Sequence, residues 1–120
     1  MNRLLTKLLY FGKLFYMQST TRWADKCNQR LAQVLADTSD SSDIRAFLGD
    51  VMTQKEIDEI AARLQAAKML TDGRKYTEII AATGLSSRTI ARIRDWIQNG
   101  NGGYKNTFTH HAHLWPDRAR

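Results

Sequence analysis

Apolar side chains recur at helical spacing in the segment that precedes residue 50. Between Thr21 and Ala36 they fall mainly three or four residues apart, which predicts a helix carrying Trp23, Cys27, Leu31, Val34 and Leu35. The serines and aspartates of residues 37–42 are typical of a loop. A short helix from about Asp43 to Gly49 is then expected to bury Ile44, Phe47 and Leu48. In this pattern Cys27 faces the helix interior as an inert packing thiol.

A capping box predicts the start of a longer helix. Thr53 is followed three residues later by Glu56 and then by an apolar-periodic run, which is the signature of a helix N-terminus. One face of this helix is expected to consist of Ile57, Ile60, Ala61, Leu64 and Ala67. Gly73 supplies a left-handed residue at which the helix can stop.

Residues 76–98 have the pattern of a helix-turn-helix. The chain must turn sharply at Gly84, and a positive φ is expected there. Ser86 or Ser87 can cap the second helix by accepting hydrogen bonds from its free amides. Leu85 can fill the gap between the two helices, whose inward faces are expected to be Ile79, Ile90, Ile93 and Ile97. No segment predicts a strand, so the fold class is all-α.

Length, cysteine content and charge narrow the possible size of the fold, its cellular location and its partner. A chain of 120 residues forms one hydrophobic core, and a single cysteine excludes a disulfide-stapled secreted fold, so we expect a cytoplasmic protein. The net charge of +6 is concentrated in two blocks of +4, residues 1–22 and 74–105, while residues 23–73 carry −3. The second block coincides with the helix-turn-helix, which favours a nucleic-acid partner.

The second helix of the motif has the chemistry of a recognition helix. Arginines at its start can each make two hydrogen bonds to guanine, and a small Ala91 leaves room for a thymine methyl group. The serines and helix amides can donate to a phosphate, and Thr77 can contact the DNA backbone. The expected DNA-binding residues are Thr77, Ser86, Ser87, Arg88, Thr89, Ala91, Arg92 and Lys105. Asp95 is the one outward acid, expected to pair with Arg92 or to mark the edge of the contact. The alternative is a helical hairpin whose arginines lie on a solvated face.

From about Ile44 to Lys105 the sequence resembles the Trp-repressor superfamily, and within it the YerC/YecD-like, Trp-repressor-related branch. The similar stretches are Arg45–Leu48, Thr53, Ala62-Arg63, Tyr76…Gly84…Thr89-Ile90…Arg92, and Asn99-Gly-Asn-Gly-Gly-Tyr-Lys105. The resemblance implies an all-helical fold in which two chains interlock through their N-terminal helices. It also implies a transcriptional regulator, with repression expected, that binds a pseudo-palindromic site on double-stranded DNA. One departure is Lys75, which stands where family members often place a capping serine.

The same resemblance places Thr53, Arg63 and Arg92 at positions that hold tryptophan in the Trp repressor. The residue after the recognition-helix arginine is glycine there and Ile93 here. Because an isoleucine side chain should fill the space that glycine leaves, we do not expect tryptophan to act as corepressor. No other cofactor is expected.

The two ends of the sequence are less distinctive. Residues 1–20 form a basic amphipathic segment, which is expected to be an extension preceding a start at Met17, a packing arm or a membrane-surface helix. Its apolar run is interrupted by Lys7 and Lys13, so no spanning helix or membrane partner is expected. Residues 106–120 are expected to be a disordered tail, despite a metal-like spacing of His110, His111 and His113.

These features predict a DNA-binding domain over residues 21–105 and a homodimeric, cytoplasmic regulator. The second possibility is a helical dimer that serves assembly and does not bind an operator. No nucleophile with a base, paired carboxylates or phosphate-binding loop is recognisable, so no catalytic or metal residues are expected; an enzyme using the tail histidines is the remaining alternative.

Overall fold

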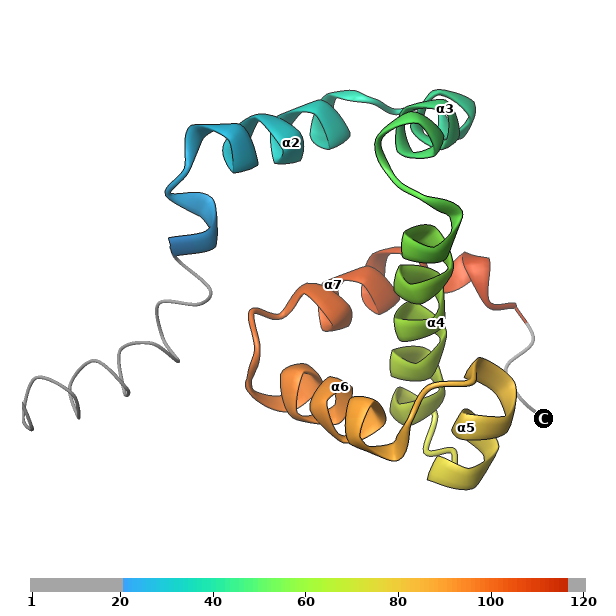
Figure 1. Cartoon of the computed structure of the whole chain (residues 1–120). Coiled ribbons are helices and arrows are strands. Elements are labelled where there is room, and N and C mark those ends of the chain that lie inside the picture. Colours follow the sequence, from blue (N-terminus) through green and yellow to red (C-terminus); the bar gives the residue numbers. More distant parts are fainter. Residues whose placement is uncertain (1–20, 117–120) are drawn as a thin grey trace, which may run out of the picture. The chain divides into compact units, whose positions relative to one another are not determined.

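The computed structural model describes residues 21–116, and in this range the chain is entirely helical (Figure 1). Six α-helices and two short 3-10 helices follow one another with no strand in the described part, which confirms the all-α class. The chain forms two compact units, residues 1–48 and 49–120. The expected domain, residues 21–105, therefore spans parts of both. The predictions for residues 1–20 lie outside the described residues.

The first unit contains η1 (Thr21–Trp23) and α2 (Lys26–Asp37). The predicted helix from Thr21 begins later because the Asp25 side chain accepts a hydrogen bond from the Cys27 backbone N–H at 2.7 Å and so caps α2. No side chain of α2 is buried. Cys27 is exposed, so its prediction as an interior thiol is wrong. The apolar stripe exists, and its side chains are exposed within residues 21–116.

Helix α3 (Ser41–Val51) is longer than predicted at both ends. The Asp40 carboxylate accepts from the Ser42 backbone N–H at 2.7 Å, which starts the helix inside the expected loop. The apolar residues expected to be buried in α3 are only half-buried, namely Ile44, Phe47 and Leu48. This helix also presents apolar surface.

Helix α4 (Gln54–Thr71) begins at the predicted capping box. The Thr53 hydroxyl accepts from the Glu56 backbone N–H at 3.2 Å, and the Glu56 carboxylate accepts from the Thr53 backbone N–H at 3.0 Å. The pKa of Glu56 is lowered below its usual value of 4.5 because its carboxylate accepts hydrogen bonds from the Thr53 backbone N–H and from the Thr53 hydroxyl. At the other end Gly73 has the predicted positive φ, 79°.

The core of the second unit lies on the C-terminal half of α4. It consists of Ala66, Ala67, Met69, Ile79, Ile90 and Ile93. The face predicted for α4 is covered only in part: Ala67 is buried and Ile57 and Leu64 are half-buried, but Ile60 is 55% exposed and Ala61 is exposed. The buried residues of α4 all lie between Ala66 and Met69, and the apolar ones form one cluster with the fully buried Ile79 and Ile90 of the helices that follow.

Two further helices end the described chain, α7 (Gly103–His110) and η2 (Ala112–Leu114). The Phe108 ring stacks on Tyr104 at 6.2 Å between centroids and meets Trp115 edge-on at 5.4 Å. Lys68, almost buried and paired with Asp72, lies 6.0 Å from the centre of the Phe108 ring. Residues 106–114 thus continue into helices and Phe108 packs against the core, in place of the disorder that we expected from residue 106, while residues 117–120 lie outside the described residues.

Candidate nucleic-acid interface

The helix-turn-helix is formed by α5 (Tyr76–Thr83) and α6 (Ser87–Asn99), as predicted. Gly84 adopts φ 73° and its N–H donates to the Ile80 carbonyl at 2.8 Å, closing α5. The Thr83 hydroxyl accepts from the Leu85 N–H at 3.2 Å, and Leu85 packs against the core. The turn therefore fixes the direction in which α6 leaves α5.

Arg74 and Lys75, which precede α5, both donate hydrogen bonds to Glu78 in its first turn. Lys75 makes no side-chain cap there, in line with its departure from the family pattern. Glu78 instead accepts from the Lys75 backbone N–H at 3.5 Å and from Arg74 Nε at 2.7 Å. The bond to Arg74 is the largest cause of the lowered pKa of Glu78. Thr77, the second residue of α5, is exposed and directly precedes Glu78 in the sequence.

Ser86 rather than Ser87 is the N-cap of α6. Its hydroxyl oxygen accepts from the Thr89 backbone N–H at 3.1 Å and its hydroxyl group donates to Thr89 Oγ1 at 3.0 Å. Thr89 is half-buried, so its hydroxyl is engaged within the motif. Ser87 is the first helical residue and is exposed.

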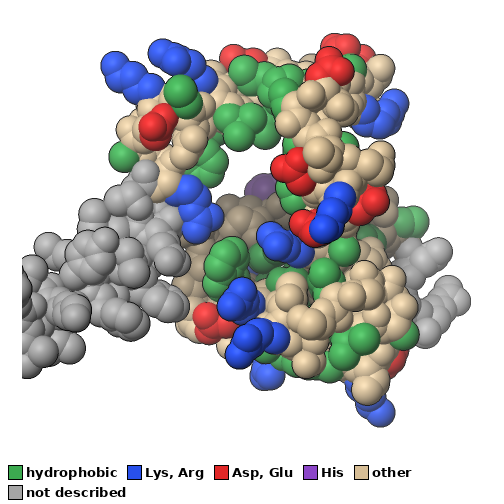
Figure 2. Space-filling model, viewed as in Figure 1, with side chains coloured by type: hydrophobic (Ala, Val, Ile, Leu, Met, Phe, Trp, Pro, Cys, Tyr) green, Lys and Arg blue, Asp and Glu red, His purple; other side chains and the backbone are tan. Residues whose placement is uncertain are grey.

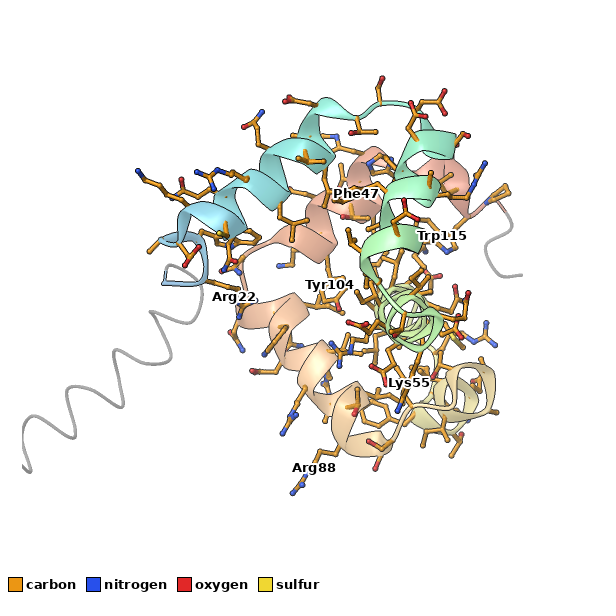
Figure 3. The ribbon with its side chains drawn as sticks, turned by 45° about the horizontal axis from the view of Figure 1, so that its top comes forward. Arg22, Phe47, Lys55, Arg88, Tyr104 and Trp115 are labelled. Atoms are coloured by element: carbon orange, nitrogen blue, oxygen red, sulfur yellow. The ribbon has the colours of Figure 1, made fainter. Side chains whose placement is uncertain are left out.

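The two faces of α6 differ sharply in polarity. Ile90 and Ile93 are 0% and 4% exposed and belong to the core. The opposite face is exposed and holds Arg88, Ala91, Arg92 and Asp95. Figure 3 shows Arg88 extending outward from the start of α6, and Figure 2 shows basic side chains exposed over this helix.

No acidic side chain among the described residues neutralises the arginines of α6. Within residues 21–116 the ion pairs are Lys68–Asp72 and Arg74–Glu78, and neither involves α6. The expected pairing of Asp95 with Arg92 is absent from the described residues, because Asp95 accepts from Asn99 Nδ2 at 2.9 Å. Arg88, Arg92 and Arg94 therefore present their charge to solvent. Arg94 adds a further exposed positive charge on α6, but two residues after Arg92 it does not share the face of Arg88 and Arg92.

Lys105 lies apart from the start of α6. It is an exposed residue of α7, the helix that follows the glycine-rich turn after α6. It lines a cavity of about 490 Å³ together with Ile97, near the end of α6, and with Lys68 and Asp72 of α4. Ile97 is nine residues after Arg88, which is about 13 Å along a helix axis. The structure thus groups Ser86, Ser87, Arg88, Ala91 and Arg92 at one end of α6 and leaves Lys105 near the other.

A second cavity, of about 450 Å³, is bounded by α4, α6 and α7. Its lining includes Ile60, Arg63, Trp96 and Tyr104. Partial burial raises the pKa of Tyr104, while the Arg63 cation opposes that shift. Of the residues that the resemblance relates to tryptophan, Thr53 is engaged in its capping box and Ile93 is packed in the core.

No helix within residues 21–116 is long and apolar enough to cross a membrane. In the same range no three histidine, cysteine, aspartate or glutamate side chains come together as a metal site. The rings of His111 and His113 lie 6.0 Å apart, at the end of α7 and in η2.

Comparison with known proteins identifies the family to which this arrangement belongs. Residues 26–112 match the sequence model of the family described as Trp repressor protein. The protein YerC of Bacillus subtilis (strain 168) is 33% identical over 76 residues, which are 63% of this chain and 73% of YerC. A solved structure of a TrpR-like protein from Eubacterium eligens ATCC 27750 is similar, with a TM-score of 0.73 and 30% identity. That similarity covers 77% of this chain and 95% of the solved one.

Proposed function

Since the chain belongs to the Trp repressor family, we propose that it is a sequence-specific DNA-binding transcriptional regulator that inserts the start of α6 into the major groove. Repression is the expected outcome because the matching family is one of repressors. The observation that carries the proposal is the outward face of α6, where exposed arginines without acidic partners lie opposite a buried isoleucine face.

The DNA contacts are proposed from the geometry of α6. Arg88 and Arg92 are one turn apart on the exposed face, so both can reach base edges or phosphates in one groove. Ala91 between them would lie against the floor of the groove. Ser87 and the first amides of α6 can donate to a phosphate at the groove edge. Thr77, near the start of α5, would contact the backbone.

We propose that the working unit is a homodimer. The apolar stripe of α2 is exposed, with Leu31 at 44%, Val34 at 42% and Leu35 at 37%. A helix with one apolar and one polar face is stabilised when a partner covers the apolar face. The family resemblance implies that this partner is a second copy of the chain. The two recognition helices would then contact half-sites about 34 Å apart in a pseudo-palindrome.

The test begins with selection of bound fragments from genomic DNA, followed by binding titrations on the recovered site. Arg88→Ala and Arg92→Ala should each weaken binding by about 1–3 kcal/mol, or roughly 5- to 150-fold. Arg88→Ala should also relax the base preference at one position of the site. Arg45→Ala, an exposed arginine of α3, is the control and should change affinity little.

The rival function, a helical assembly protein, is favoured by the same exposed stripe of α2 and makes a different prediction. Such a protein would form a stable dimer in sedimentation experiments but select no DNA at physiological salt. Selection without enrichment of any sequence, or equal affinities of Arg92→Ala and wild type, would therefore contradict the DNA-binding proposal.

A further inference from the structure

Asp95 is the only acidic residue of α6, and it lies on the arginine-bearing face. It follows Arg92 by three residues and Arg88 by seven, so it stands about 10 Å further along the helix axis than Arg88. Its side chain is exposed. A helix that enters the major groove by its start would bring a residue at this distance toward the level of the phosphates, because the groove is about 8.5 Å deep.

The negative charge of Asp95 is held in place and is not neutralised. Asn99, one turn later, donates its side-chain N–H to Asp95 Oδ1 at 2.9 Å. An amide is neutral, so it orients the carboxylate without cancelling its charge. Arg92 and Arg94 are close in sequence, but neither forms an ion pair with Asp95 in residues 21–116.

Helix stability gives only a weak reason for the acid. The hydrogen bond between Asp95 and Asn99 one turn later stabilises a helix slightly, but aspartate is a poor residue for a helix interior. Its carboxylate makes no contact with the core, which α6 meets through Ile90 and Ile93. The position therefore combines an exposed charge, a cost to the helix and a location on the proposed DNA-binding face.

We propose that the Asp95 carboxylate is a selectivity group that weakens binding to DNA of unrelated sequence by repelling backbone phosphates. This inference rests on the proposed function of α6. Phosphate contacts supply essentially all non-specific affinity for DNA, and a like charge against them opposes that affinity. On unrelated DNA the arginines find no matching bases, and the outward face of α6 rests against phosphates. On the correct site the base contacts hold α6 in the groove and outweigh the repulsion.

The test is Asp95→Asn, which removes the charge and keeps the size of the side chain. The probe is a fluorescent duplex of random sequence, about 30 base pairs long so that it spans two half-sites. Asp95→Asn should tighten binding to this probe about threefold or more at 50 mM salt, and the gain should shrink at 200 mM. Affinity for the selected site should rise less, so the ratio of specific to non-specific affinity should fall.

Asp58→Asn is the matched control. Asp58 is also exposed and also accepts from an amide one turn away, Gln54 Nε2 at 2.8 Å, but it belongs to α4. Both variants raise the net charge of the chain equally, so a difference between them isolates the position of the charge. The inference is wrong if Asp95→Asn tightens non-specific binding no more than Asp58→Asn does, or if it weakens that binding.

Arg92→Ala on the same random duplex separates the two proposals. If Arg92→Ala weakens binding while Asp95→Asn changes nothing, α6 is the DNA-binding helix and only the inference about Asp95 is overturned. If neither variant changes binding, α6 is not the DNA-binding surface and both proposals are overturned. Circular dichroism of each variant checks that the helical fold is retained.

Discussion

Replacing Gly84 with alanine should destabilise the protein, whereas the same replacement at Gly49 should stabilise it. A methyl group built at either position meets no atom within 4 Å, so neither effect is steric. Gly84 has φ 73°, and a left-handed conformation costs an alanine about 1–2 kcal/mol. Alanine also lowers the conformational entropy of the unfolded chain, which raises the free energy of unfolding by about 0.4–1 kcal/mol. The net decrease in the free energy of unfolding for Gly84→Ala is therefore about 1 kcal/mol.

Gly49 provides the internal control because it lies within α3 and lacks a positive φ. There the intrinsic helix preference of alanine should add about 0.5–1 kcal/mol to the free energy of unfolding. The two variants should thus move the stability in opposite directions, separated by about 1.5–2 kcal/mol.

Urea denaturation followed by far-ultraviolet circular dichroism measures both effects. The protein concentration must be the same for all variants, because association contributes to apparent stability. Gly84→Asn should fall between wild type and Gly84→Ala, since asparagine tolerates the left-handed region better. A Gly84→Ala variant as stable as wild type would show that the turn does not need a left-handed residue, and the account of how α6 is directed would fail.

Two further predictions concern the core and the start of α4. Ile90 is fully buried, so Ile90→Ala should lower the free energy of unfolding by about 2–5 kcal/mol in the same urea assay, and a loss below about 1 kcal/mol would contradict the packing of α6. Because the pKa of Glu56 is lowered, its charged carboxylate stabilises the fold at pH values above 4.5, the usual pKa. This contribution to the free energy of unfolding disappears as the pH falls through the lowered pKa. Wild type should therefore be more stable than Glu56→Gln at neutral pH and converge with it in acid, whereas a gap independent of pH would refute the charge effect.

The features that sequence alone predicted well are made by residues close together in the chain. The capping box joins Thr53 to Glu56, and Ser86 caps a helix through Thr89, three residues away. The left-handed turn at Gly84 depends on one residue type. Such features follow from local backbone chemistry, so they could be stated without knowing what packs against them.

The features that sequence did not predict depend on contacts across the fold. Periodicity marked an apolar stripe on α2 but could not show that its side chains are exposed in the part of the chain that the structure describes. The glycines and histidines near the end suggested disorder, whereas Phe108 contacts Tyr104 in its own helix and Trp115 beyond it. For the candidate site, Arg88, Ala91 and Arg92 were correctly placed on the outward face. Of the two alternatives for Asp95, the ion pair with Arg92 is not found in the described residues, where the Asn99 amide one turn later donates to its carboxylate.

The exposed thiol on α2 makes this helix accessible to chemistry without any engineering. Cys27 is the only cysteine in the sequence, so a maleimide or a spin label would attach at one place. A thiol that reacts quickly in dilute protein and slowly in concentrated protein would report that another molecule covers α2. Spin labels at Cys27 would, in addition, give the separation of the two α2 helices whenever two copies come together.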